Sequence, residues 1–182
     1  MTFNELFFTE QMFLKNAKSV LDNDALVEVT DSYISEVAMG VISCAFALEA
    51  LINSLYRESG KLHSYERIEI RSKIEILGYI ANVSVDYGQM PWQGIAELIR
   101  VRNWLVHFKD PYIGLIGSDG QYICDQNHSI PKIQPKGVFN KAKLKKYYRS
   151  VLCGGKQFAE ALNLRDYFTF LFDESYSFYE LG

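Results

Sequence analysis

The segment from Tyr33 to about Arg57 carries the longest helical pattern in the chain, and it limits the folds that the chain can adopt. Its middle, Val41 to Leu48, is apolar on almost every side. A helix without a polar face has to lie in the centre of a bundle, with other helices packed around it. The sequence Glu58-Ser59-Gly60 ends the pattern, because a glycine just after a helix favours its termination. This segment therefore predicts an all-α bundle with one central helix.

Five further segments carry helical patterns, separated by loops. Ser64 and Asn140 are candidate N-caps of two of them, because their side-chain oxygens can accept hydrogen bonds from the first free amides of a helix. Helices joined by short loops pack antiparallel to their neighbours, so we expect an antiparallel bundle of four to five helices. The segments are 3–21, 64–80, 91–108, 140–162 and 166–180.

The chain fits a single domain, 1–182, with an insertion between its helical core and its C-terminal helices. The core covers 1–110, and the C-terminal helices cover about 140–180. Between them, about 111–138 holds four glycines and three prolines. Two short alternating runs there flank Asp119-Gly120, and Asp-Gly is a favoured hairpin turn. The insertion therefore predicts a small β-hairpin.

Composition and charge exclude several classes of protein. A net charge of -3 argues against a general polyanion binder. The three cysteines, Cys44, Cys124 and Cys153, fit neither a disulfide framework nor a metal spacing, and there is no glycine-rich phosphate loop. We therefore expect no cofactor and no metal. The N-terminus does not resemble a signal peptide, and no apolar run approaches the about 20 residues that span a bilayer. We expect a cytoplasmic protein without a membrane partner.

Arg102 lies in the middle of an apolar helical stripe, where a charged residue is unusual. On a helical wheel it falls between five apolar positions, Ile95, Leu98, Ile99, Leu105 and Val106. A guanidinium group in such a place is costly unless it is paired or faces a crevice. Asn103 and His107 are four residues apart and share the edge of this stripe. The three polar side chains are therefore candidates for a functional site.

The sequence around this site resembles that of a known family. Arg102 to His107, RNWLVH, fits the Arg-x4-His motif of HEPN domains, including the Asn that often follows the Arg. Upstream, 46–56 with its internal Glu49 resembles the long second helix of such domains, and 71–77 resembles the helix that follows. The resemblance covers about 34–110.

The resemblance implies a metal-independent endoribonuclease. His107 would take the proton from a ribose 2′-hydroxyl, since its ordinary pKa is near about 6.5. Arg102 would stabilise the charge on the phosphate, Asn103 would assist, and Glu49 would support one of the two catalytic residues. In HEPN ribonucleases the motif helices of two protomers meet, so the resemblance implies a homodimer through the motif helix, with the apolar stripe as its seam. It also implies a toxin or phage-defence role, with an antitoxin or another regulatory protein as partner.

Two alternatives remain open from the residues themselves. Arg102 could pair with a buried carboxylate such as Glu49 in a purely structural dimer, while His107 acts as a cation at a helix C-terminus, where the macrodipole favours it. Glu49 could instead occupy an exposed edge of its helix. Alternatively, the chain is a non-catalytic HEPN-type helical module that uses the same groove to bind RNA, a nucleotide or a partner protein.

A basic run lies in the C-terminal half of the chain. No acidic residue occurs between Asp125 and Glu160, and Tyr147 and Tyr148 are interleaved with the basic residues. Such a surface can combine phosphate contacts with base stacking, so it predicts an RNA-binding surface. The alternative is a solvated helix face, and the acidic tail with Asp166, Asp173, Glu174 and Glu180 could also neutralise the basic run. The candidate RNA-binding residues are Lys141, Lys143, Lys145, Lys146 and Arg149.

Overall fold

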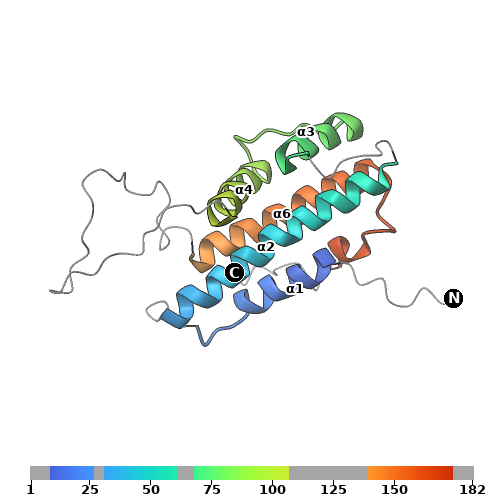
Figure 1. Ribbon diagram of the computed structural model, residues 1–182. Coiled ribbons are helices and arrows are strands. Elements are labelled where there is room, and N and C mark those ends of the chain that lie inside the picture. Colours follow the sequence, from blue (N-terminus) through green and yellow to red (C-terminus); the bar gives the residue numbers. More distant parts are fainter. Residues whose placement is uncertain (1–8, 27–30, 61–67, 107–138, 174–182) are drawn as a thin grey trace, which may run out of the picture.

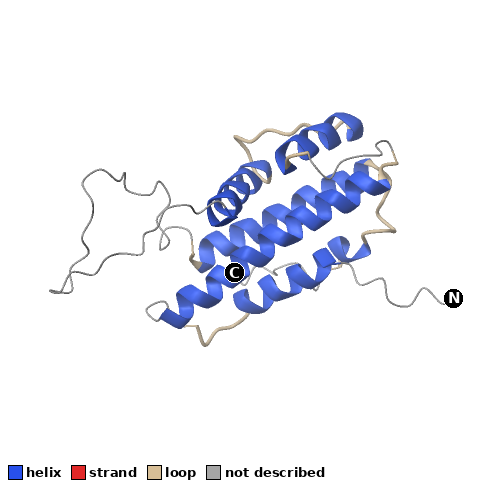
Figure 2. Ribbon diagram, in the orientation of Figure 1, coloured by secondary structure: helices blue, strands red, loops and turns tan. Residues whose placement is uncertain are grey.

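The computed structural model describes residues 9–26, 31–60, 68–106 and 139–173, and this part of the chain is all-helical (Figures 1 and 2). The predicted hairpin lies outside the described residues. The described helices are α1 (Thr9–Leu21), α2 (Asp31–Glu58), α3 (Ile70–Ala81), α4 (Trp92–Val106), α6 (Lys141–Ala161) and the one-turn 3-10 helix η1 (Thr169–Phe172). An all-α bundle, as predicted, is confirmed for these ranges.

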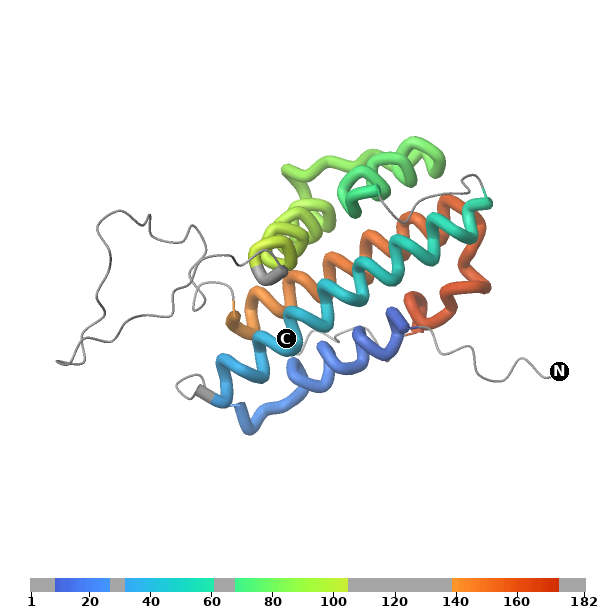
Figure 3. The backbone as a smooth tube through the Cα atoms, in the orientation of Figure 1, coloured from blue at the N-terminus to red at the C-terminus, as the bar shows by residue number. Residues whose placement is uncertain are grey.

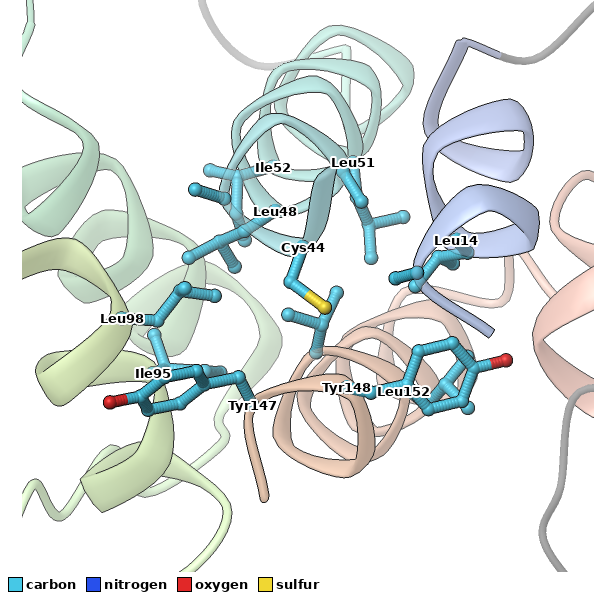
Figure 4. Close-up of a cluster of buried hydrophobic side chains, with 14 of the residues drawn as sticks. Leu14, Cys44, Leu48, Leu51, Ile52, Ile95, Leu98, Tyr147, Tyr148 and Leu152 are labelled. Carbon is cyan, nitrogen blue, oxygen red and sulfur yellow. The ribbon is translucent and has the colours of Figure 1, made fainter. Parts of the chain in front are cut away.

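Helix α2 forms the centre of the bundle. Figure 4 shows its residues Cys44, Leu48, Leu51 and Ile52 among side chains from three other helices. The surrounding side chains include Leu14 of α1, Ile95 and Leu98 of α4, and Tyr147, Tyr148 and Leu152 of α6. All of these residues are at most 6% exposed. The middle of α2, which has almost no polar face, is therefore buried on several sides, as such a helix requires.

The four longest helices alternate in direction. Helix α1 runs antiparallel to α2, since the rings of Phe13 and Phe46 lie 5.3 Å apart and Val20 packs near Gly40. Helices α2 and α6 run side by side in the same direction (Figure 3), because Gly40 faces Leu144 and Leu51 faces Gly155. At Gly40, an added Cβ would lie 2.7 Å from Leu144 Cδ2. Close packing at these glycines is what lets α6 approach α2.

Helix α4 runs antiparallel to α6. Trp92 and Ile95 of α4 pack on Gly154, near the end of α6, whereas Gly94 faces Ser150 and Glu97 binds Lys143, which comes earlier in α6. Because α2 and α6 are parallel, α4 is also antiparallel to α2. The predicted antiparallel arrangement thus describes α1, α2, α4 and α6.

Helix α3 departs from that arrangement. Ile70 shares a pocket with Leu48 and Glu49, and Lys73 binds Asn53. Contacts that advance together along both helices mean that α3 runs in the same general sense as α2. The stretch between α2 and α3, 59–69, is longer than a tight turn, so the rule that short loops join antiparallel helices does not apply to this pair.

The predicted start of α3 and the predicted last helix are wrong, whereas the predicted start of α6 is confirmed. Helix α3 begins at Ile70, and the described residues before it, Ile68 and Glu69, are not helical. In place of the described part of the predicted last helix, 166–180, the chain forms η1, which buries Phe170 and Leu171 beside Phe168. These three buried residues stand at positions i, i+2 and i+3, a spacing that does not place them on one face of an α-helix. By contrast, Asn140 caps α6 as predicted, and its Oδ1 accepts a hydrogen bond from the Lys143 amide at 2.9 Å.

The length and apolar composition of α2 from Ser32 to Glu58 would also suit a membrane-spanning helix. Half of its most apolar stretch is buried by the rest of the bundle. A core helix of a soluble protein has the same properties, so α2 carries no inference about a membrane.

Candidate functional site

The candidate site is built on the last turn of α4, where Arg102 and Asn103 lie. The apolar residues that precede them on α4 are buried inside their own chain: Ile95 is 1% exposed, Leu98 0% and Ile99 7%. These three residues are therefore not free to form the predicted dimer seam, and a dimer through the motif helix stays a prediction. They pack against α2 and α6 within the bundle.

Arg102 forms an ion pair with Glu49 of α2. Its Nη2 donates to Glu49 Oε2 at 3.1 Å and to Oε1 at 3.3 Å. The Arg102 side chain is 29% exposed and that of Glu49 is 37% exposed. The predicted Arg102–Glu49 contact is confirmed, although the carboxylate is open to solvent rather than buried. This pairing explains how a guanidinium is tolerated within an apolar stripe.

The guanidinium group is held at two of its nitrogens and unsatisfied at the third. Nη1 donates to Asn103 Oδ1 at 3.1 Å. Nε is buried and has no hydrogen-bond partner among the described residues. A buried polar atom without a partner destabilises a fold by about 1–3 kcal/mol, so this N–H would gain from an acceptor outside the described ranges.

A small pocket of about 10 Å³, about the size of one water molecule, lies beside this ion pair, where α2, α3 and α4 meet. Its polar lining comes from Glu49 and Arg102, and its apolar lining comes from Ala45, Leu48, Ile70, Leu98 and Ile99. The pocket therefore offers one carboxylate and one guanidinium on an otherwise apolar wall.

His107 follows the last residue of α4 in the sequence and lies outside the described residues. The structure therefore brings together three of the four predicted residues of the site: Glu49, Arg102 and Asn103.

All five candidate RNA-binding residues interact with other groups of the chain. Lys141 Nζ donates to the Asn23 carbonyl at 2.6 Å. Lys143 and Lys146 both bind Glu97 of α4, at 2.9 and 2.8 Å. Lys145 is exposed and Arg149 is half-buried on the same helix. A carboxylate from another helix thus neutralises part of the basic run.

The pKa of Glu97 reflects this arrangement. Partial burial raises the pKa, but the hydrogen bonds and charges of Lys146 and Lys143 outweigh burial and hold it below its ordinary value. Glu97 is therefore ionised at neutral pH and stays bound to both lysines. A polyanion that recruits these lysines has to compete with it.

The described ranges contain no group of three or more His, Cys, Asp or Glu side chains that could hold a metal ion. Cys44 is fully buried, and burial raises the pKa of its thiol far above the ordinary value. Cys44 therefore belongs to the core, as its sequence context predicts.

One polar contact was not anticipated from the sequence. Lys73 of α3 is only 7% exposed, and its Nζ donates to Asn53 Oδ1 of α2 at 2.6 Å. The signal for it was available, because Lys73 falls on the apolar face formed by Ile70, Ile74 and Leu77. Its partner Asn53 lies one helical turn along α2 from Glu49.

The chain matches no known protein-family model, and no curated protein or solved structure matches it significantly. The likeness to HEPN domains therefore rests on the motif residues and on the helices that carry them.

Proposed function

We propose that the chain is a HEPN-like, metal-independent endoribonuclease. The observation that carries this proposal is that Arg102 lines the small pocket with a buried Nε that has no partner among the described residues, and that His107 follows five residues later in the sequence. The Nε–H group of Arg102 could donate a hydrogen bond to a phosphate oxygen, which is a strong acceptor for a charged donor.

The reaction would be an internal transesterification of RNA. Neutral His107 takes the proton of a ribose 2′-hydroxyl, and the 2′-oxygen attacks the adjacent phosphorus. Arg102 binds the non-bridging oxygens, on which negative charge develops in the transition state. The bond from phosphorus to the 5′-oxygen breaks, and that oxygen takes up a proton. The products are a 2′,3′-cyclic phosphate and a 5′-hydroxyl end, and the step needs neither a metal nor a cofactor.

Glu49 and Asn103 would act as positioning residues. Both bind the guanidinium group and fix its orientation relative to the pocket. A homodimer through the motif helix would complete a composite site. Since the upstream apolar residues of α4 are buried, that contact would involve the end of the helix around Arg102. A regulatory partner such as an antitoxin is part of the same proposal.

The test is RNA cleavage in excess EDTA by the full chain, compared with His107→Ala. The expected result is cleavage by the parent chain alone, with cyclic-phosphate and 5′-hydroxyl ends. Arg102→Gln should also abolish cleavage. Cleavage that persists in His107→Ala, or that EDTA abolishes, would contradict the proposal.

The second candidate is a non-catalytic helical module that binds RNA, a nucleotide or a partner protein. The observation that favours it is that Nη1 and Nη2 of Arg102 already have partners in the chain. A folded parent chain that binds RNA without cleaving it would support this candidate over the enzyme.

A further inference from the structure

We propose that Lys73 is a second phosphate-binding cation, and that it contacts an RNA backbone phosphate next to the one bound by Arg102. This inference rests on the proposed function only for the identity of the ligand as RNA. The site itself consists of Lys73 and Asn53, one turn along α2 from the Arg102–Glu49 pair.

Lys73 is a cation with a neutral partner. The residue is 7% exposed, and its hydrogen bond goes to an amide oxygen of exposed Asn53, which carries no formal charge. The buried part is therefore the aliphatic stem, which carries the ammonium group to the edge of the surface. Among the described residues, no carboxylate lies within ion-pair distance of its Nζ. A bound anion would supply the missing charge.

Arg102 and Lys73 reach the same strip of α2 from two different helices. Arg102 of α4 binds Glu49, and Lys73 of α3 binds Asn53, four residues further along α2. Residues four apart on a helix lie on one face, with Cβ atoms about 5–6 Å apart. Ile70, which lines the pocket beside Arg102, lies one turn before Lys73 on α3. The two cations therefore border one continuous surface.

This surface is accessible from solvent. Asn53 is exposed, and the side chains of Glu49 and Arg102 are about one-third exposed. A ligand can therefore approach Lys73 along the outer side of α2. Two cations in succession suit a chain of phosphates rather than a single small anion, which favours the backbone of single-stranded RNA.

The experiment measures binding of a fluorescein-labelled single-stranded oligoribonucleotide as a function of salt. All variants are made in the full chain with His107→Ala, so that the RNA remains intact. Lys73→Gln should weaken binding about tenfold and should reduce the slope of log K against log salt by about 0.7, the value for one phosphate contact on a single strand. Lys15→Gln is the matched control, because it removes the same charge from an exposed position of α1.

A second variant keeps the test independent of any folding defect. Asn53→Asp places a carboxylate beside Lys73, so it should stabilise the chain while weakening RNA binding. Asn16→Asp, at an exposed position of α1, controls for the added charge. A purely structural Lys73 would gain the stability without any loss of binding.

The outcomes separate this inference from the proposed function. Binding that depends on Lys73 and Asn53, in a parent chain that cleaves no RNA, would support the phosphate site and contradict the ribonuclease. Equal affinities and equal salt slopes for each variant and its control would overturn the phosphate site, whether or not the parent chain cleaves RNA.

Discussion

Replacing Glu49 with Gln removes the charged partner of Arg102 while keeping a side chain of similar shape. Fully exposed ion pairs are worth about 0–1 kcal/mol, and breaking a buried pair costs about 3–5 kcal/mol. The two side chains are 29% and 37% exposed, which places this pair between those limits. We expect a coupling energy of about 1–2 kcal/mol. In a chain of 182 residues, that loss lowers Tm by about 2–8 °C.

The assay is a double-mutant cycle of urea unfolding with Glu49→Gln, Arg102→Met and the double variant. The matched control is the pair Arg71–Glu75, whose side chains are 57% and 53% exposed. Its coupling should be below about 0.5 kcal/mol. The reasoning is refuted if the two cycles give equal couplings, because partial burial would then contribute nothing to the Glu49–Arg102 pair.

Three further predictions concern the packing and charges of the bundle. Glu97→Gln should lower the free energy of unfolding at pH 7 by about 1 kcal/mol. Because the pKa of Glu97 lies below its ordinary value of 4.5 in the folded chain, the difference between variant and parent should vanish in urea titrations as the pH falls below that value. Gly94→Ala should cost about 1–3 kcal/mol in the same assay, since an added Cβ would overlap Ser150 Oγ and lie 2.9 Å from its Cβ; adding Ser150→Gly should recover part of the loss. Cys44 should resist iodoacetamide in the native chain and react only after unfolding, as peptide mass spectrometry would show, whereas exposed Cys153 should react at once; equal rates would contradict the burial of Cys44.

The sequence was most informative where one local signal determined the outcome. The apolar middle of α2 predicted a helix at the centre of the bundle, and the structure buries it on several sides. Asn140 was identified as an N-cap from residue type and position, and it caps α6. The direction of α3 was not predictable in this way, because it appears only in contacts with α2, such as Lys73–Asn53, that join residues far apart in the sequence.

The site was predicted less completely, because its contacts join residues far apart in the sequence. Glu49 and Arg102 are separated by 53 residues, so their pairing stood as one alternative among several. The basic run of α6 contains no acidic residue of its own, yet Glu97 of α4 neutralises Lys143 and Lys146 across 46 and 49 positions. Charge patterns within one helix do not show what a neighbouring helix places beside them.

The Glu49–Arg102 pair also determines how a phosphate could use the guanidinium group. If the phosphate displaces Glu49 from Nη2, binding has to overcome the coupling energy of about 1–2 kcal/mol, and Glu49→Gln should tighten RNA binding by about 5–30-fold. If the phosphate instead uses the unsatisfied Nε, Glu49 keeps the group in place, and Glu49→Gln should weaken binding by loosening it. We expect the second result, because the buried Nε gains a partner without any existing bond being broken. Measuring the affinity of Glu49→Gln for a labelled oligoribonucleotide in the His107→Ala chain decides between the two, and tighter binding would show that Glu49 competes with the ligand.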